Sequence, residues 1–212
     1  MTVMQKFLRR YTDLPALIHL LKTKSIAFLD PSLWDDKNDA YFMSLYKQKM
    51  GLSTLLAVCC SQESETYHHW RVFSNGSSGV CISFRRNVLI GVLEANDTVR
   101  SGEVEYLKIK SLRNSNIDVA RMPFLKRAPY GPEREFRFIY ESKATRLHVK
   151  QYPIPLNCID RIYLSPWMPE AIADEVKATL KQIDGVKGIP ITRSTLIRND
   201  DWQRYGEAIV SQ

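Results

Sequence analysis

Three charged side chains alternate with aromatic ones in a short stretch late in the sequence. The segment PYGPEREFRFIY, residues 129–140, carries Glu133, Glu135 and Arg137 at every second position. Successive side chains of a β-strand point to opposite faces, so these three would share one face. Two carboxylates one strand step apart suit proton transfer and the stabilisation of developing positive charge. The simpler alternative is a half-buried strand whose polar face is solvated.

The composition indicates a single domain, residues 1–212. Of the 212 residues, 44% are hydrophobic and 25% are charged, which is enough for one sizeable core. The formal charge of +7 and the pI near 9.2 favour polyanionic partners such as nucleic acid. The apolar run LPALIHLL is too short for a membrane span or a signal peptide, and the four cysteines form no CxxC pair. We therefore expect a cytoplasmic protein with no membrane partner.

The hydrophobic pattern predicts the elements that would position the charged row. TLLAVCCS, residues 54–61, is continuously apolar and predicts a central strand buried on both faces. GVCISF (79–84) and REFRFIY (134–140) are further predicted strands, and PEAIADEVKATLKQI (169–183) has apolar residues at helical spacing. Strands outnumber helices without strict alternation. The predicted class is α+β, with a central mixed or antiparallel sheet flanked by helices.

The well-known cofactor and metal motifs are absent from the sequence. It has no GxGxxG, P-loop, GxSxG or HExxH pattern. His68 and His69 are adjacent, and neighbours on a helix do not share a face. WDDKNDAYF, residues 34–42, lacks the glycine and the distal glutamate of an EF-hand loop, so it predicts a capped turn into a helix. We predict no metal site.

Four segments carry a resemblance to a known family. They are RRYTDLPALIHLLKTKSIAFLDPSLWDDKND, AVCCSQESETYHHWRVFSNGSSGVCISF, PFLKRAPYGPEREFRFIYE and IPLNCIDRIYLSP. Together they resemble the bacterial domain-of-unknown-function family 2971 over nearly the whole chain. The features of the family pattern that the chain keeps are Asn38-Asp39, Ser61, Trp70, Gly79-Val80 and the Glu-x-Glu-x-Arg of 133–137. It departs from the pattern at Ala40, Cys60, Phe73 and Tyr130.

A second resemblance supplies a chemistry. LRRYTDL, residues 8–14, is similar to the opening of ADP-ribosyltransferases, in which a basic residue lies on the first strand. In those enzymes a serine or threonine on a central strand and a glutamate, often within Glu-x-Glu, follow in that order. Arg10, Ser61 and the pair Glu133/Glu135 occur in this order here. The resemblance implies an ADP-ribosyltransferase-like fold with a split sheet.

The same resemblance implies NAD as the substrate and assigns roles. Glu135 and Glu133 would be catalytic, because cleavage of the nicotinamide–ribose bond develops positive charge that a carboxylate stabilises. The residues that would bind NAD are Arg10, Thr12, Ser61, Trp70 and Arg137. The expected function is an ADP-ribosyltransferase-like, NAD-using enzyme that acts on nucleic acid in a bacterial toxin or phage-defence setting. The alternative reaction is simple hydrolysis of NAD by an NAD glycohydrolase.

The competing hypothesis is a non-catalytic nucleic-acid-binding or interaction protein. Basic residues interspersed with Tyr106 and Phe124 would contact phosphates and stack on bases. These basic residues are Lys108, Lys110, Arg113, Lys126 and Arg127. The alternative is a solvated face rich in lysine and arginine. Consumption of NAD by the purified protein separates the two functional hypotheses.

Overall fold

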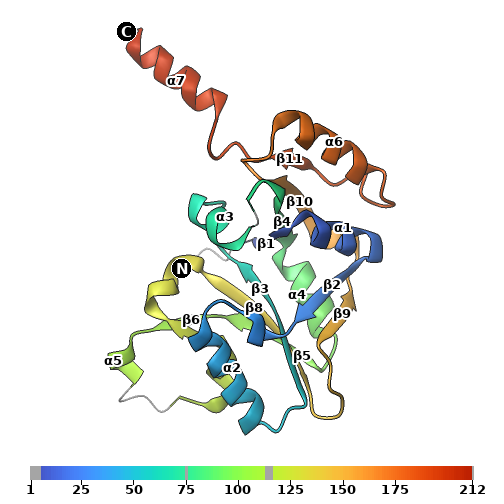
Figure 1. Ribbon diagram of the computed structural model, residues 1–212, viewed down its shortest axis with the longest axis vertical. Coiled ribbons are helices and arrows are strands. Elements are labelled where there is room, and N and C mark those ends of the chain that lie inside the picture. Colours follow the sequence, from blue (N-terminus) through green and yellow to red (C-terminus); the bar gives the residue numbers. More distant parts are fainter. Residues whose placement is uncertain (1–5, 75, 113–116, 212) are drawn as a thin grey trace.

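Eleven strands and seven helices follow one another irregularly along the described part of the chain (Figure 1). The computed structural model describes residues 6–74, 76–112 and 117–211. The strands are β1 Phe7–Asp13, β2 Ser25–Leu29, β3 Thr54–Ser61, β4 Gly79–Arg85, β5 Val99–Glu103, β6 Glu105–Leu107, β7 Leu125–Arg127, β8 Glu135–Ser142, β9 Val149–Pro153, β10 Ile159–Leu164 and β11 Ile191–Arg193. The helices are α1 Leu14–Thr23, α2 Lys37–Lys49, α3 Tyr67–Phe73, α4 Arg86–Glu94, α5 Ile109–Leu112, α6 Glu170–Lys181 and α7 Asp200–Val210.

Strand β3 is the branching point of the main sheet. In the described residues this sheet has nine strands, in the order β11-β10-β4-β1-β3-β2-β9, with β8 and β5 joined on through β3. β3 pairs with β8 along its whole length, from Thr54 to Ser61, but meets β1 only at Ser61 and β2 only at Ala57. The sheet therefore divides at β3, and the described pairs are antiparallel except β10–β11 and the separate ribbon β6–β7.

Strand β8 separates two apolar clusters because its side chains alternate between faces. Phe136 and Phe138 pack into the main core, while Ile139 packs against Met43 and Tyr46 of α2 in a second cluster. The polar row occupies the same face as Ile139, yet it is not solvated. Glu135 is 6% exposed and Arg137 is 0% exposed. The hypothesis of a wet outer face is therefore wrong.

Aspartate side chains cap the starts of α1 and α2. Asp13 accepts a hydrogen bond from Ala16 N at the start of α1, where Pro15 has no N–H to leave unpaired. Asp36 accepts from the Asn38 and Asp39 backbone N–H groups at the start of α2. The predicted turn into a helix at WDDKNDAYF is confirmed, and the cap fixes where Asp39 lies.

The structure confirms the coarse fold prediction. It is a single α+β domain with a mixed central sheet flanked by helices, and the predicted strands at 54–61, 79–84 and 134–140 correspond to β3, β4 and β8. The predicted resemblance of the fold to that of ADP-ribosyltransferases stays a prediction. None of the helices in the described part of the chain has the length and apolar character of a membrane span.

Candidate functional site

A pocket of about 520 Å³ lies where β1, β3 and β8 meet. Its acidic lining residues are Asp35, Asp36, Asp39, Glu133 and Glu135. Its basic lining residues are Arg9, Lys126 and Arg137, and its aromatic ones are Tyr11, Trp34, Phe73 and Tyr130. This size and mixture of apolar walls and convergent charges is typical of small-molecule sites.

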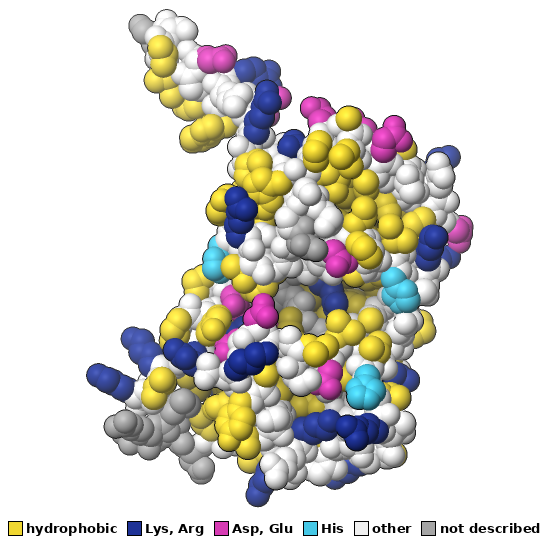
Figure 2. All heavy atoms as spheres, viewed as in Figure 1, with side chains coloured by type: hydrophobic (Ala, Val, Ile, Leu, Met, Phe, Trp, Pro, Cys, Tyr) yellow, Lys and Arg dark blue, Asp and Glu magenta, His cyan; other side chains and the backbone are white. Residues whose placement is uncertain are grey.

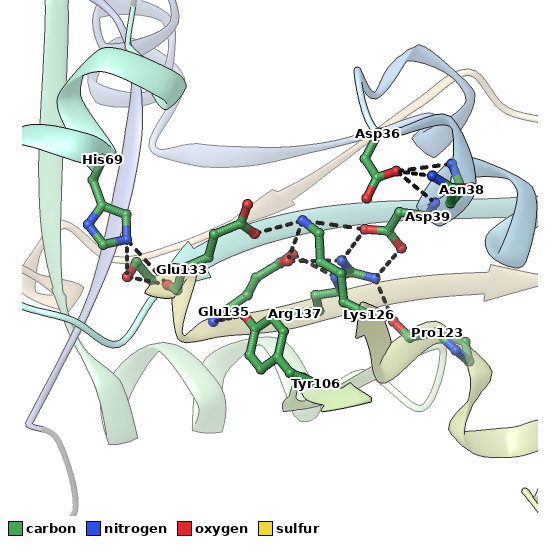
Figure 3. A network of polar contacts seen from close by, with 11 residues as sticks. Asp36, Asn38, Asp39, His69, Tyr106, Pro123, Lys126, Glu133, Glu135 and Arg137 are labelled. Atoms are coloured by element: carbon green, nitrogen blue, oxygen red, sulfur yellow. Dashed lines mark hydrogen bonds and ion pairs between the residues drawn. The ribbon is translucent and has the colours of Figure 1, made fainter. Parts of the chain in front are cut away.

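Five of the charged side chains that line this pocket form one network (Figure 3), namely Asp39, Lys126, Glu133, Glu135 and Arg137. Arg137 donates from Nε to Glu135 Oε1 at 2.6 Å and from Nη2 to Glu135 Oε2 at 2.9 Å. Arg137 Nη1 and Nη2 both donate to the Asp39 carboxylate, and Nη1 also donates to the Pro123 carbonyl at 2.9 Å. A guanidinium suits this role because its planar fork matches two carboxylates at once.

Lys126 completes the network from β7. Its Nζ lies 2.6 Å from Glu133 Oε2, 3.4 Å from Glu135 Oε2 and 3.6 Å from Asp39 Oδ2. Its side chain is only 9% exposed. Three buried carboxylates thus share two cations, Lys126 and Arg137, which leaves a surplus of one negative charge when all are ionised.

The two glutamates of the Glu-x-Glu pair differ in their proton affinity. Burial raises the pKa of Glu135, but Arg137 and Lys126 outweigh burial and lower that pKa to about 2. For Glu133, burial prevails over the attraction of Lys126, so its pKa is raised above the ordinary value. Burial raises the pKa of Asp39 as well, against the opposing effect of Arg137. Glu135 is therefore a permanent carboxylate, and Glu133 is the better proton acceptor.

Ser61 fixes the segment that carries Glu133. It is the direct partner of Glu135 in the β3–β8 ladder. Its Oγ donates to the Glu133 carbonyl at 2.7 Å, accepts from Glu63 N at 3.1 Å and lies 3.2 Å from His69 Nε2. The prediction that Ser61 shares a cleft with the Glu-x-Glu pair agrees with this geometry. Its hydroxyl binds the protein backbone rather than standing free for a ligand.

The basic residue of β1 that reaches the pocket is Arg9, not Arg10. Arg9 and Tyr11 line the pocket, whereas Arg10 is on the other face of β1 together with Leu8, a member of the main core. Thr12 shares that other face and is not a lining residue. The predicted sharing of one cleft by Arg10 and Glu135 is wrong, because a one-residue step along a strand reverses the face.

Trp70 is also absent from the pocket lining. It is 0% exposed, its indole N–H donates to Glu65 at 2.8 Å, and Tyr11 packs edge-on against its ring at 5.3 Å. Trp70 supports Tyr11 from behind and does not face the cavity. Its predicted role as an NAD-binding residue has no geometric basis.

The predicted basic patch is not continuous. Lys126 belongs to the pocket network, because three carboxylates offset the cost of burying its ammonium. Lys108, Lys110 and Arg127 are exposed, and Arg113 lies outside the described residues. The hydroxyl of Tyr106 accepts from Glu135 N at 2.8 Å, which ties this side chain to the start of β8. Nucleic acid as a partner stays a prediction.

Several pocket residues were not predicted from the sequence. Asp39, on α2, lies 98 residues from Arg137 in the chain, and only its place in the kept Asn38-Asp39 pair singled it out. Trp34 stacks over the Arg137 guanidinium at 4.8 Å, and Lys126 Nζ lies 4.7 Å from the Tyr130 ring. Within the described residues no cluster of histidine, cysteine, aspartate and glutamate could hold a metal ion.

The comparisons with known proteins return no match. No family model, no curated protein and no solved structure matches this chain. The resemblances to the domain-of-unknown-function family and to ADP-ribosyltransferases thus stay predictions, and the function is argued from the pocket alone.

Proposed function

We propose that this pocket binds NAD and cleaves its nicotinamide–ribose bond, in the manner of ADP-ribosyltransferase-like enzymes. The observation that carries the proposal is the Glu133/Glu135 pair, in which two carboxylates of one pocket have pKa values shifted in opposite directions. Such separation gives neighbouring carboxylates different roles in acid/base chemistry. Structural ion pairs also shift pKa values, so the proposal depends equally on the open cavity beside them.

Each glutamate has one task in the proposed reaction. The bond between C1′ of the ribose and the nicotinamide nitrogen breaks, and its electron pair passes to the nicotinamide ring, which becomes neutral. Glu135 stays ionised and stabilises the positive charge that develops on the ribose, while Arg137 holds it in position through two hydrogen bonds. Glu133 accepts the proton of the attacking water, hydroxyl or amine.

The remaining lining fits the other parts of NAD. Among the pocket residues that the structure describes, Arg9 is the one cation in no ion pair with a carboxylate, and it is the proposed contact for the pyrophosphate. The surplus of carboxylates favours the cationic nicotinamide ring at the opposite side. Phe73 and Tyr130 are the proposed stacking partners of the planar rings.

The first test compares two adjacent arginines. Release of nicotinamide from NAD is measured with the wild-type protein, Arg9→Gln and Arg10→Gln. We expect the wild type to release nicotinamide. Arg9→Gln should raise the KM for NAD at least ~10-fold, because a charged hydrogen bond is lost. Folded Arg10→Gln should have a KM within about twofold of the wild type. A larger effect from Arg10 than from Arg9 would contradict the assignment.

The second test follows the pH dependence of the same rate. Glu133 with a raised pKa should give an acidic limb in which the rate falls as the carboxylate is protonated. Glu133→Gln should remove that limb and slow the reaction at neutral pH by about 100-fold. Glu141→Gln, on β8 outside the pocket, is the matched control and should keep both the limb and the rate. No release of nicotinamide by the folded wild type would refute the proposal.

A further inference from the structure

Helix α7 carries an apolar stripe that no other segment in the described part of the chain covers. Trp202, Tyr205, Ile209 and Val210 recur at helical spacing and are 77%, 65%, 56% and 88% exposed. No residue of α7 is buried. The helix projects from the end of the molecule, and hydrophobic atoms follow one of its sides (Figures 1 and 2). An isolated 11-residue helix is marginal in water, so its stability depends on packing.

A second group of exposed apolar side chains lies at the pocket. Leu33, Val72 and Phe73 line this pocket and are 78%, 54% and 38% exposed. We call these three residues the rim. Large exposed apolar side chains that gather at one pocket indicate a contact surface. Among the described residues, the side chains of the rim and of the stripe both stay exposed.

We propose that α7 of one protomer, which we call the arm, docks on the rim of a second copy of this chain. The arm of the second copy docks in return on the rim of the first. The proposal does not rest on the proposed function. Twofold symmetry repeats one arm–rim contact twice and covers both uncovered surfaces of both chains, which an unrelated partner on either surface alone would not do. Each docked arm covers the mouth of the partner's pocket, so association controls access to it.

The area that docking would bury favours this occupant. The two aromatic side chains of the stripe each bury roughly 150 Å² or more. With arm and rim counted in both contacts, the buried surface is on the order of 1,200 Å² or more, which reaches the range of stable interfaces.

Sedimentation equilibrium of the full chain tests the exchange. We expect the wild type to have twice the 24.5 kDa chain mass at tens of micromolar. Trp202→Asp should raise the dimer dissociation constant at least ~100-fold, as loss of a central aromatic contact does. Arg204→Gln changes the charge by the same amount on the polar face of α7 and should leave the dimer intact. A monomeric wild type, or a dimer unaffected by Trp202→Asp, overturns the proposal.

Mixing two defective variants identifies the docking surface. Leu33→Asp has an intact arm and a damaged rim, and Trp202→Asp the reverse. Each alone should be monomeric, and an equimolar mixture should form heterodimers that dissociate more readily than the wild-type dimer, because one of the two contacts is intact. Both substituted side chains are exposed, so neither change should affect folding. If Leu33→Asp stays dimeric, or if the mixture does not associate, the rim is not the docking surface and the proposal fails.

Discussion

Strand β8 takes part in two arginine–carboxylate clusters that differ in one decisive respect. At its start, Glu135 and Arg137 join Asp39, Glu133 and Lys126 around a pocket. At its other end, Glu141 accepts from Arg100 Nε and Nη2 at 3.1 Å each, and Arg100 also donates to the Tyr46 hydroxyl at 2.7 Å. Each arginine donates two hydrogen bonds to one glutamate carboxylate.

The difference lies in charge balance and access. Arg100 and Glu141 are one cation and one anion, 38% and 20% exposed at their side chains, and no described pocket is lined by either. The network of Arg137 is almost fully buried, has one more carboxylate than cations, and borders a cavity. A balanced pair holds two strands together, whereas an unbalanced one beside a cavity is suited to a positively charged reaction centre.

The largest expected difference between the clusters is in stability. Arg137→Met leaves Glu135 and Asp39 buried beside each other with Lys126 as their remaining nearby cation, and should lower the free energy of unfolding by about 3–5 kcal/mol. Arg100→Met breaks a partly exposed pair and should cost about 1 kcal/mol. Urea unfolding of both variants measures the two values. Equal losses would mean that burial does not distinguish the clusters.

The second prediction concerns acid. Glu135 has a pKa of about 2 in the folded protein, below its ordinary value, so its ionised form favours folding. This contribution is fully present above the ordinary pKa of glutamate and is lost as the pH falls toward 2. Glu135→Gln should remove up to about 3 kcal/mol of that acid dependence. The unfolding free energies of wild type and variant should therefore converge as the pH falls.

Glu133 and Asp39 act in the opposite direction, because their pKa values are raised and their ionisation disfavours folding as the pH rises. Comparing each variant with wild type at every pH isolates the contribution of Glu135. A constant difference between wild type and Glu135→Gln across the acid range would show that the pKa of Glu135 is not depressed.

A smaller effect is expected on the pKa of Glu133. Lys126 lowers the pKa of Glu133 against the effect of burial, so Lys126→Met should raise that pKa further. Carbon-detected NMR titration of the glutamate carboxyl groups measures the change. Glu141, which has no contact with Lys126 in the described structure, is the internal reference. A lower pKa of Glu133 in the variant would contradict the network.

The smallest expected effect is on the salt dependence of nucleic-acid binding, and it distinguishes buried from exposed cations. If the protein binds nucleic acid, Lys108→Gln and Arg127→Gln should each reduce the slope of log affinity against log salt by about 1, since each loses one phosphate contact. Lys126→Gln should leave the slope unchanged, because its ammonium is already held by carboxylates. A reduced slope for Lys126 would show that it leaves the pocket to bind phosphate.

The sequence predicted the strands that carry the site better than the charged residues that complete it from other elements. Alternation along β8 and the apolar run of β3 correctly placed Glu135, Arg137 and Ser61 on neighbouring strands. Arg9 was missed for Arg10 because a strand pattern with arginine at both positions does not define which face each one takes. Neither Asp39 nor Lys126 could be assigned from local pattern, since their partners lie far away in sequence or in another element, and charged residues are mostly exposed.

The rate of nicotinamide release by Glu135→Gln, relative to Glu141→Gln, tests the central claim most directly. Both changes remove one negative charge from β8 and leave a hydrogen-bonding amide of the same size. With saturating NAD, Glu135→Gln should lose at least ~100-fold in kcat, because the carboxylate that stabilises the transition state is gone. Glu141→Gln should stay within about twofold of the wild type. Equal rates in the two folded variants would contradict a catalytic role for the pocket carboxylates.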